Sequence, residues 1–323
     1  MRKYIRICGL LLGLALCTAA FWTGAKGQTE TEASSTVYHP QKERVTRILL
    51  LGCDRASGLS DSILLVSINE SERQASVLQI PRDTYAEYTD RDYKKINGAL
   101  SALGEGGIKE FLSSALGVPI HYFAVVKLDL FCKIVDAVGG VDIDVPQKME
   151  YHDPAQDLHI SLDAGMQHLD GQAAEHFVRY RAGYVNADLG RLDAQKLFLR
   201  AFAAKCRDLT AAECLGAVGS MLTGVQTDIG IGEAIRLGTV LRACDPDAVP
   251  MQTLAGQAVK GQSGAWYYVV NREGACRQIG ELTYPDSIVN LTDFDADGLF
   301  DRVQNSEFHK VYTAAEDELP FAF

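Results

Sequence analysis

Residues that could bind a magnesium ion and a pyrophosphate group are concentrated in three short stretches of the sequence, 52–61, 80–83 and 178–191. Planar guanidinium groups form bidentate hydrogen bonds with phosphate oxygens, and Mg²⁺ is usually held by one or two carboxylates together with substrate phosphates. The stretches include four arginines and four aspartates of this kind: Arg82, Arg179, Arg181, Arg191, Asp54, Asp61, Asp83 and Asp188. This set of residues points to the chemistry of a metal-bound pyrophosphate.

The two acids of the first stretch are the candidate metal ligands. Asp54 follows an apolar run that is typical of a buried strand, and Asp61 precedes another such run. Acids on a short loop held by a sheet could share one Mg²⁺ or Mn²⁺ with phosphate oxygens. Taken alone, the same pattern also fits a turn capped by Asp61 and a solvated Asp54.

The arginines are candidates for holding the phosphates. Arg82 follows Pro81 at the end of a predicted strand, and Arg179 and Arg181 flank Tyr180 at the end of a predicted helix. If this second segment is extended, both arginine side chains lie on one side of it. Two neighbouring like charges repel each other unless an anion answers them. The alternative is a set of ordinary surface charges at the ends of elements.

Asp188 and Arg191 lie at the beginning of the next predicted helix. A helix N-terminus favours bound phosphate, which adds to the charge of Arg191. Asp188 could position Arg191 or accept the proton of an incoming hydroxyl group. Lys95 and Asn97, in the segment Lys95-Ile96-Asn97, could add polar contacts near the site.

The N-terminus predicts that this chemistry takes place outside the cytoplasm. Residues 5–22 form an apolar run that Arg2, Lys3 and Arg6 precede or enter. This pattern predicts a cytoplasmic tail (1–4), a single transmembrane anchor (5–22) and a polar linker (23–43), with a cleaved signal peptide as the alternative. Free nucleoside triphosphates are scarce outside the cytoplasm, so a lipid-linked pyrophosphate is the expected ligand.

Composition excludes several other classes of protein. The chain has 323 residues, of which 47% are hydrophobic, so it can build a substantial core and is not globally disordered. Its formal charge of −11 argues against nucleic acid as a partner, because non-specific binding there depends on neutralising phosphates. The sequence contains no GxSxG elbow, Walker loop or GxGxxG, which disfavours serine hydrolases, nucleotide hydrolases and dinucleotide enzymes.

The eight cysteines do not show a metal-binding pattern. Cys8 and Cys17 lie in the apolar N-terminal run, and the other six have no CxxC spacing. An exported protein could pair them in disulfides, and free buried thiols are an equal alternative.

A second metal site is suggested near the C-terminus. Residues 293–301 have the acid spacing of a calcium loop, but the twelfth position is Gln304, where an EF-hand has Glu. The segment predicts a Ca²⁺ loop or, as the alternative, a solvated acidic turn.

Strand-like and helix-like segments alternate along the chain, which predicts an α/β domain with a mixed sheet flanked by helices. The predicted strands are 47–53, 62–68, 75–80, 122–126, 141–145, 250–254 and 265–270. The predicted helices are 107–116, 128–138, 171–179, 191–209, 228–242 and 273–282. We therefore predict a single domain over residues 44–284, followed by a C-terminal tail over 285–323.

Read together, these stretches resemble the LytR-CpsA-Psr family. The resemblance covers about residues 44–200, with weaker similarity to about residue 282. It is carried by the segments 60–69 (SDSILLVSIN), 80–85 (IPRDTY), 95–97 (KIN), 138–146 (VGGVDIDVP), 169–172 (LDGQ), 178–181 (VRYR) and 188–191 (DLGR), in this order, behind the N-terminal anchor.

The resemblance implies a membrane-anchored phosphotransferase whose catalytic domain lies outside the cytoplasm, in an envelope of the Gram-positive type. Members of the family move a glycopolymer, such as teichoic acid or capsule, from a polyprenyl pyrophosphate carrier to peptidoglycan. Their α/β domain has a hydrophobic groove for the polyprenyl chain. By the matching motifs, Asp54 and Asp61 are the metal ligands, while Asp188 acts on the acceptor. The pyrophosphate contacts are Arg82, Arg179, Arg181 and Arg191, with Lys95, Asn97 and Gln195 as further substrate-binding residues.

The sequence departs from the family pattern at two positions beside these motifs, and the loop between Asp54 and Asp61 is shorter than in many members. Ser60 and Ala194 stand where many members carry arginine. Two other functions therefore remain open. Water could replace the acceptor hydroxyl, which would make the protein a pyrophosphate hydrolase, or the protein could be a non-catalytic lipid-binding regulator of the cell wall.

Overall fold

The computed structural model describes residues 44–283, apart from 55–57, 89–93, 155–157, 186–187, 211–212, 214–216, 218–223 and 261–263. The predicted anchor (5–22), most of the linker, the candidate Ca²⁺ loop (293–301) and the C-terminal tail (285–323) lie outside the described residues. Among the helices that are described, none has both the length and the apolar character needed to cross a membrane.

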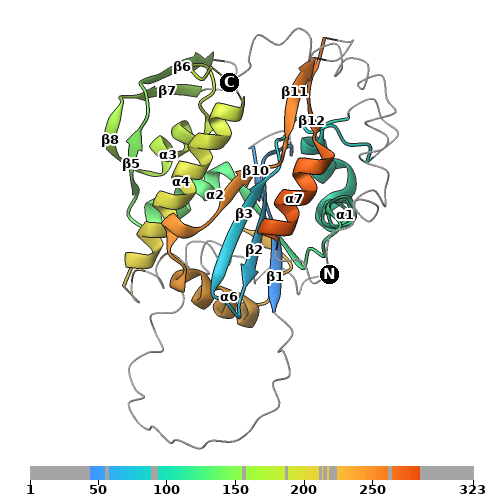
Figure 1. The fold of residues 1–323 in the computed structure, drawn as a ribbon. Coiled ribbons are helices and arrows are strands. Elements are labelled where there is room, and N and C mark those ends of the chain that lie inside the picture. Colours follow the sequence, from blue (N-terminus) through green and yellow to red (C-terminus); the bar gives the residue numbers. More distant parts are fainter. Residues whose placement is uncertain are drawn as a thin grey trace, which may run out of the picture.

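A mixed six-stranded sheet forms the centre of the domain, with the strand order β10-β3-β2-β1-β4-β9 (Figure 1). Its strands are β1 (Val45–Cys53), β2 (Ser60–Asn69), β3 (Gln74–Gln79), β4 (Tyr122–Lys127), β9 (Gln226–Thr227) and β10 (Met251–Thr253). β1–β2, β2–β3 and β4–β9 are antiparallel pairs, whereas β1–β4 and β3–β10 are parallel. The predicted α/β class and mixed sheet are confirmed.

The central strands of this sheet are buried on both faces, and apolar residues point to each face. In β1, Leu49 and Leu51 point to one face, whereas Ile48 and Leu50 contact the clusters on the other. This explains why the sequence of β1 contains a nearly continuous apolar run, without alternation of apolar and polar residues. The sheet therefore has two separate hydrophobic layers.

One face of the sheet carries α1 (Ala99–Leu116) and α7 (Arg272–Leu282), with the hairpin of β11 (Gly256–Lys260) and β12 (Trp266–Val270) beside them (Figure 1). α1 is interrupted at Gly104, whose φ of 73° is outside the helical range. Only the part after this interruption was expected from the sequence, as a helix over 107–116. A left-handed residue in a helix is tolerated here because glycine has no Cβ.

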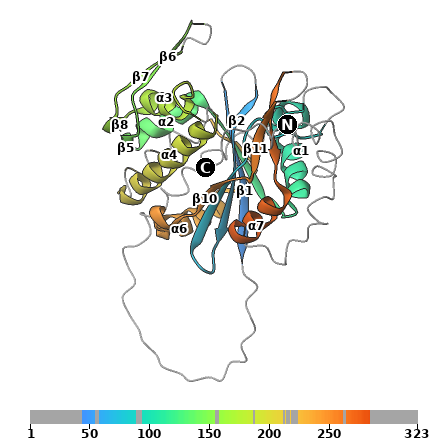
Figure 2. The same cartoon turned by 45° about the horizontal axis from the view of Figure 1, so that its top comes forward.

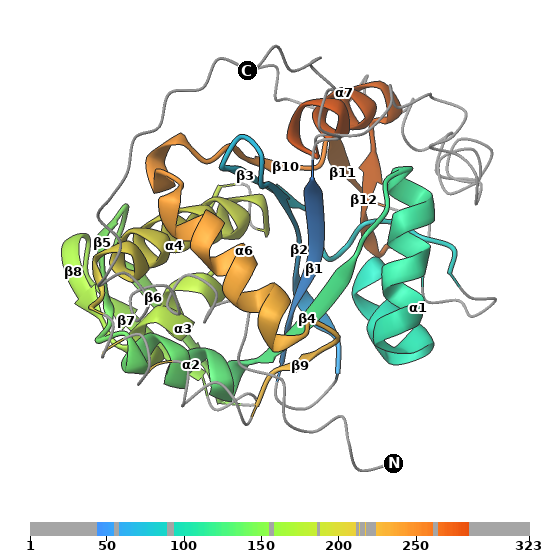
Figure 3. The ribbon, with the colours of Figure 1, turned by 90° about the horizontal axis from the view of Figure 1, so that it is seen from below.

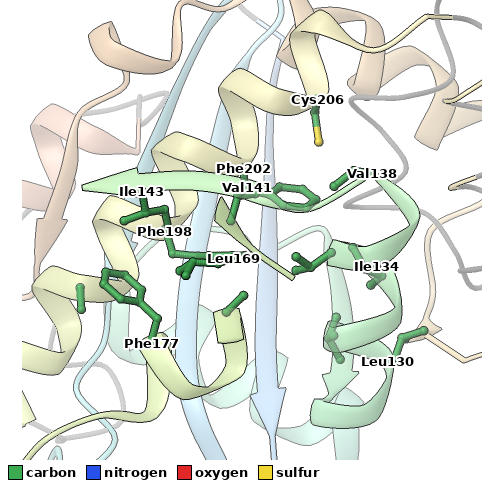
Figure 4. Packing of buried hydrophobic residues seen from close by; sticks show 14 of the residues in the cluster. Leu130, Ile134, Val138, Val141, Ile143, Leu169, Phe177, Phe198, Phe202 and Cys206 are labelled. Carbon is green, nitrogen blue, oxygen red and sulfur yellow. The ribbon is translucent and has the colours of Figure 1, made fainter. Parts of the chain in front are cut away.

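The other face carries α2 (Leu128–Ala137), α3 (Gly171–Arg179) and α4 (Asp188–Asp208). Their apolar sides pack together with the pair β5 (Val141–Val145) and β8 (Gly165–Leu169), as Figure 4 shows. Phe198 and Phe202 of α4 are stacked, and Phe177 of α3 is completely buried in the same cluster. α6 (Ile231–Ala243) covers this face beside Ile48 and Ile68, at the other end of β1 from Cys53 (Figure 3).

A hairpin of β6 (Met149–Asp153) and β7 (Leu158–Leu162) extends away from the rest of the domain beside α3 (Figure 2). Five strands, β6, β7, β8, β9 and β11, were not expected from the sequence. In β6 only Met149 is buried, and the following Glu150, Tyr151 and His152 are exposed. A strand with so little apolar alternation gives a weak sequence signal.

Candidate active site

Three sheet strands bring one set of predicted site residues to the same edge. β1 ends at Cys53, and β2 begins at Ser60 and runs in the opposite direction. β3 is antiparallel to β2, so it also ends at this edge, three residues before Arg82. Asp54 therefore follows the end of β1, Asp61 is the second residue of β2, and Arg82 follows β3.

The connection from α3 to α4 brings the other set. α3 ends at Arg179, and Tyr180 is extended and buried, so that Arg179 and Arg181 both line one cavity. α4 begins at Asp188, three residues earlier than predicted, which places Arg191 in its first turn. A Cβ atom at position 190 would overlap the Tyr184 ring, so Gly190 allows this connection to pack on α4.

Ion pairs join the two sets. Arg82 Nη1 lies 2.5 Å from Asp61 Oδ1, and Arg82 Nε lies 3.6 Å from Asp188 Oδ1. Arg191 Nη2 lies 3.0 Å from the same Asp188 oxygen. Asp188 thus lies between the two arginines and links the sheet edge to the first turn of α4.

The remaining two arginines differ in their partners. Arg179 Nη1 lies 2.8 Å from Glu175 Oε1, four residues earlier on α3. The side chain of Arg181 is exposed, and no carboxylate pairs with it within the described part of the chain. Arg181 is therefore the cation of this group whose charge is available without breaking a pair.

Two buried nitrogen atoms of the cluster form no hydrogen bond, although one of them, Arg82 Nε, lies within ion-pair distance of Asp188 and Asp83. The Nε atoms of Arg82 and Arg191 form no hydrogen bond with any residue that the structure describes. A buried donor without a partner costs about 1–3 kcal/mol. Both residues line the same cavity, so an anion bound there would add acceptor oxygens beside their guanidinium groups.

Burial and the neighbouring carboxylates act in opposite directions on these two guanidinium groups. For Arg82, burial works against the charged form, but Asp188 and Asp61 outweigh it and raise the pKa. For Arg191, burial dominates and lowers the pKa, although Asp188 acts in the opposite direction. A further phosphate charge beside Arg191 would favour its charged form.

Asp61 and the four arginines line a cavity of about 490 Å³. Besides Asp61 and the four arginines, the wall is mainly apolar, and it includes Leu50, Leu64, Val126, Leu128, Phe131, Leu158, Val178, Phe198 and Leu199. These side chains come from β1, β2, β4, α2, β7, α3 and α4. A cavity with an apolar wall and one cationic end fits a molecule with a hydrocarbon part and a phosphate part.

The two predicted metal ligands lie close to Cys53. Burial raises the pKa of the Cys53 thiol to about 11. A hydrogen bond with Ser60 lowers this pKa, whereas the carboxylates of Asp54 and Asp61 raise it further. Asp54 Oδ1 also accepts a hydrogen bond from Gly58 N at 3.1 Å. No group of three or more His, Cys, Asp or Glu side chains suited to a metal occurs among the described residues. Two carboxylates nevertheless fit Mg²⁺, which takes few protein ligands and completes its shell with phosphates and water.

The structure places Lys95 and Asn97 beside the cluster and not in the cavity wall. Lys95 Nζ lies 2.8 Å from Asp83 Oδ1 and 5.5 Å from the centre of the Tyr267 ring. Asn97 is buried, and its backbone N donates to Arg82 O at 3.1 Å. Both contacts hold the segment that carries Arg82.

Gln195, Ser60 and Ala194 have different surroundings. Gln195 lines the cavity, and its amide donates to Val178 O at 3.3 Å and accepts from Gln79 at 3.4 Å. Ser60 and Ala194 are buried, so an arginine at either position would need space that this chain has filled.

The structure also brings in residues that the sequence analysis did not select. Glu175 pairs with Arg179, and Tyr184 and Phe131 line the cavity. Burial raises the pKa of Tyr184 to about 12. The four-residue spacing between Glu175 and Arg179 on a predicted helix was an available signal for the first of these. No local pattern marks the other two, because they become neighbours only through packing.

The described cysteines, which are Cys53, Cys132, Cys206, Cys244 and Cys276, are not joined in disulfides. For these five, the alternative of free thiols is therefore the one the structure shows.

The fold and the site together define a class of α/β proteins that join an arginine–aspartate cluster to an apolar cavity. The model of the LytR_cpsA_psr family matches residues 18–282. This match covers well over half of the chain, and the chain therefore belongs to the LytR-CpsA-Psr family.

Named relatives agree with this family. The chain is 31% identical over 254 residues to the polyisoprenyl-teichoic acid–peptidoglycan teichoic acid transferase TagU of Bacillus cereus, with 76% of this chain and 78% of that protein covered. It is 30% identical over 259 residues to TagU of Oceanobacillus iheyensis, covering 76% and 77%.

Solved structures share the fold. TagV of B. subtilis matches with a TM-score of 0.64 and 23% identity, covering 76% of this chain and 98% of that one. TagT bound to LI-WTA matches with a TM-score of 0.62 and 24% identity, covering 78% and 94%.

Proposed function

We propose that this protein transfers teichoic acid or a related glycopolymer from a polyprenyl pyrophosphate carrier to peptidoglycan. The observation that carries the proposal is the cavity, in which an apolar wall ends at Arg82, Arg179, Arg181, Arg191 and Asp61. The names of the TagU relatives, at 30–31% identity, support the same reaction.

The two parts of the cavity match the two parts of such a donor. The apolar wall from α2, α3 and α4 binds the polyprenyl chain, whose transfer from water is favourable by about 25 cal/mol for each Å² buried. The arginines bind the pyrophosphate through hydrogen bonds from their guanidinium groups. The bound donor is thus oriented with its phosphorus atoms at the edge of the sheet.

Asp54 and Asp61 are the residues that would hold Mg²⁺ or Mn²⁺. When bound, such an ion supplies positive charge that lowers the cost of charge on the phosphate oxygens. Asp61 pairs with Arg82 in this structure. On binding, the Asp61 carboxylate would also contact the metal ion, and the Arg82 guanidinium would also contact the pyrophosphate.

Asp188, which pairs with Arg82 and Arg191 beside the cavity, would act on the acceptor. It accepts the proton of a peptidoglycan hydroxyl group while the hydroxyl oxygen attacks the sugar-proximal phosphorus. The bond from this phosphorus to the bridging oxygen breaks, polyprenyl phosphate leaves, and a phosphodiester joins the polymer to the acceptor. Arg82 and Arg191 hold Asp188 in place and stabilise the charge that develops on the phosphates.

The proposed location follows from the sequence. Residues 5–22 would anchor the chain in the membrane, with the domain outside the cytoplasm in an envelope of the Gram-positive type. The donor lipid and the peptidoglycan acceptor are then both accessible to the same domain.

The test measures two products at once. The chain beginning at Gln41 is incubated with Mg²⁺, a short polyprenyl pyrophosphate saccharide and peptidoglycan fragments, with Arg82→Ala as the comparison. We expect release of polyprenyl phosphate together with saccharide attached to peptidoglycan, and loss of both in the variant. Release without attachment would favour a hydrolase, and binding without either product would favour a regulator.

A further inference from the structure

One buried carboxylate next to the site is not used in the proposed reaction. Glu175 lies on α3, its side chain is 5% exposed, and it is not among the residues that line the cavity. Burying a carboxylate is costly unless it is paired and hydrogen-bonded. An apolar residue of similar volume would often be neutral or stabilising at such a position. Stability alone therefore does not explain a glutamate here.

Both oxygens of this carboxylate have partners on different elements. Oε1 lies 2.8 Å from Arg179 Nη1, and Oε2 accepts a hydrogen bond from Cys132 Sγ of α2 at 3.1 Å. The first contact fixes the direction of a guanidinium group that lines the cavity, and the second holds the carboxylate against α2. The glutamate thus connects Arg179 to the packed core between α2 and α3.

Three other carboxylates pair with cavity arginines in the described part of the chain. Asp61 and Asp188 have separate proposed roles, and Asp83, which pairs with Arg82, also pairs with Lys95. Asp61 would also hold a metal, and Asp188 would also accept a proton. Glu175 does not line the cavity, but it pairs with Arg179, which does. We propose that Glu175 is a positioning residue, which holds the Arg179 guanidinium toward the pyrophosphate of the donor. This inference rests on the proposed function for the identity of the ligand.

The physical basis is the flexibility of arginine. An arginine side chain has many rotamers and loses this conformational entropy when it is ordered. Glu175 orders the side chain during folding, so binding of the donor does not have to do so. The guanidinium has five N–H donors, so the contact with Glu175 uses only part of its capacity.

The test is a double-mutant cycle that uses farnesyl pyrophosphate as the probe and calorimetry to measure its Kd. We expect Glu175→Gln to weaken binding about tenfold, because the neutral amide holds the guanidinium less firmly. Arg179→Ala should weaken binding at least as much. In the Arg179→Ala background, Glu175→Gln should change the Kd by less than about twofold, because there is no guanidinium left to position.

Two further variants separate positioning from damage to the fold. Glu175→Leu places an apolar side chain of similar size at this position. We expect this variant to fold and to lose as much affinity for farnesyl pyrophosphate as Glu175→Gln. Glu70→Gln is the matched control, because Glu70 is another mostly buried carboxylate, paired with Arg236 away from the cavity. Its Kd should equal that of the unmodified protein.

The outcomes distinguish this inference from the proposed function. If the unmodified protein does not bind farnesyl pyrophosphate, the proposed function fails. If it binds and both Glu175 variants bind equally well, the positioning role is wrong. A loss from Glu175→Gln that persists at full size in the Arg179→Ala background also overturns the inference, because the effect would not pass through Arg179.

Discussion

At the scale of single residues, the site is built from charges that partly neutralise one another. Arg82 pairs with Asp61, Arg191 with Asp188, and Arg179 with Glu175. The exposed Arg181 has no carboxylate partner in the described regions. Binding of a pyrophosphate therefore adds to existing pairs at three positions, but supplies the first anion at Arg181.

This difference predicts that Arg181 contributes to function without contributing to stability. Arg181→Ala should lower kcat/KM for transfer about 30-fold or more, which corresponds to about 2 kcal/mol for one preorganised charge contact. The free energy of unfolding should change by less than about 0.5 kcal/mol, because no pair is broken. Steady-state kinetics and denaturant unfolding measure the two effects.

Arg207→Ala is the control for Arg181→Ala. Arg207 is another exposed arginine, and it pairs with Asp245 away from the cavity. Its removal should leave kcat/KM unchanged. Near-normal transfer in the Arg181 variant would show that this arginine is not part of the pyrophosphate site.

The chemistry of the site was largely visible in the sequence, whereas its supports were not. The arginines and aspartates carry their chemistry in their residue types, and each follows or precedes a strand or helix that the apolar pattern predicts. Glu175 and the Lys95–Asp83 pair act through contacts between elements. Such contacts depend on packing, which residue order alone does not specify.

At the scale of elements, α4 serves both ends of the cavity. Its first turn carries Asp188 and Arg191, and its next turns supply Phe198 and Leu199 to the apolar wall. Phe198 lies 5.0 Å from Phe131 of α2 between ring centres, which packs the two helices together at the wall. One helix therefore sets the distance between the phosphate end and the hydrocarbon end.

The wall can be blocked separately from the phosphate end. Leu199→Trp should fill part of the cavity and weaken binding of farnesyl pyrophosphate about tenfold, because two fewer buried CH₂ groups correspond to that loss. Binding of inorganic pyrophosphate should stay the same. Calorimetry with both ligands measures this, and Leu197→Trp is the control because Leu197 is an exposed neighbour outside the cavity wall.

If Leu199→Trp lost the same affinity for both ligands, the substitution would disturb α4 as a whole. If the affinity for neither ligand changed, the hydrocarbon part would bind elsewhere.

Helix α3 also carries a group that makes the domain sensitive to pH. Burial lowers the pKa of His176, and Arg179 and His159 add to this effect, while Glu175 and Asp170 oppose it. The unfolded chain has a histidine pKa of about 6.5, so it binds the proton before the folded protein does. The free energy of unfolding should therefore fall as the pH decreases through about 6.5.

His176→Gln tests this assignment. Its midpoint of thermal unfolding should depend less on pH between 7.5 and 5.5 than that of the unmodified protein, since the proton uptake on unfolding is removed. Thermal scans at several pH values measure this. Parallel curves for the two proteins would show that other groups cause the pH dependence.

Most of the strands that the sequence pattern did not predict are short strands outside the central sheet. The sheet strands β1, β2 and β3 are long or strongly apolar, and their positions were predicted within about two residues. β7 and β8 have only five residues each, and in β8 only Leu169 is buried. Such strands acquire their conformation from the partner strand, so a single short segment gives little evidence of them.

At the scale of the whole molecule, the last described helix closes the domain. α7 buries Ala275, Ile279 and Leu282 in the core on its face of the sheet. Arg47 of β1, which is 1% exposed, donates from Nε to Thr283 O at 2.8 Å, and Ser76 of β3 donates to Leu282 O. The end of α7 is thus joined to the two strands on either side of β2.

These contacts predict where the chain can end. A chain that stops after Thr283 keeps every contact described for α7, and it should unfold at the temperature of the full chain. A chain that stops after Val270 loses the buried Ile279 and Leu282, worth about 1.5–3 kcal/mol each, and leaves two buried donors without acceptors. The total is about 5 kcal/mol or more, which is comparable to the whole stability of many domains.

Thermal and denaturant unfolding of the two shortened chains distinguish the outcomes. The shorter chain should lack a cooperative transition, because the loss removes one side of the sheet's hydrophobic layer together with the acceptors for Arg47 and Ser76. A cooperative transition at the original temperature would mean that α7 is an addition to a domain already complete at Val270. The apolar cavity lies on the opposite face of the sheet, so any loss of pyrophosphate binding in the shorter chain would report the global fold and not a contact of α7 with the ligand.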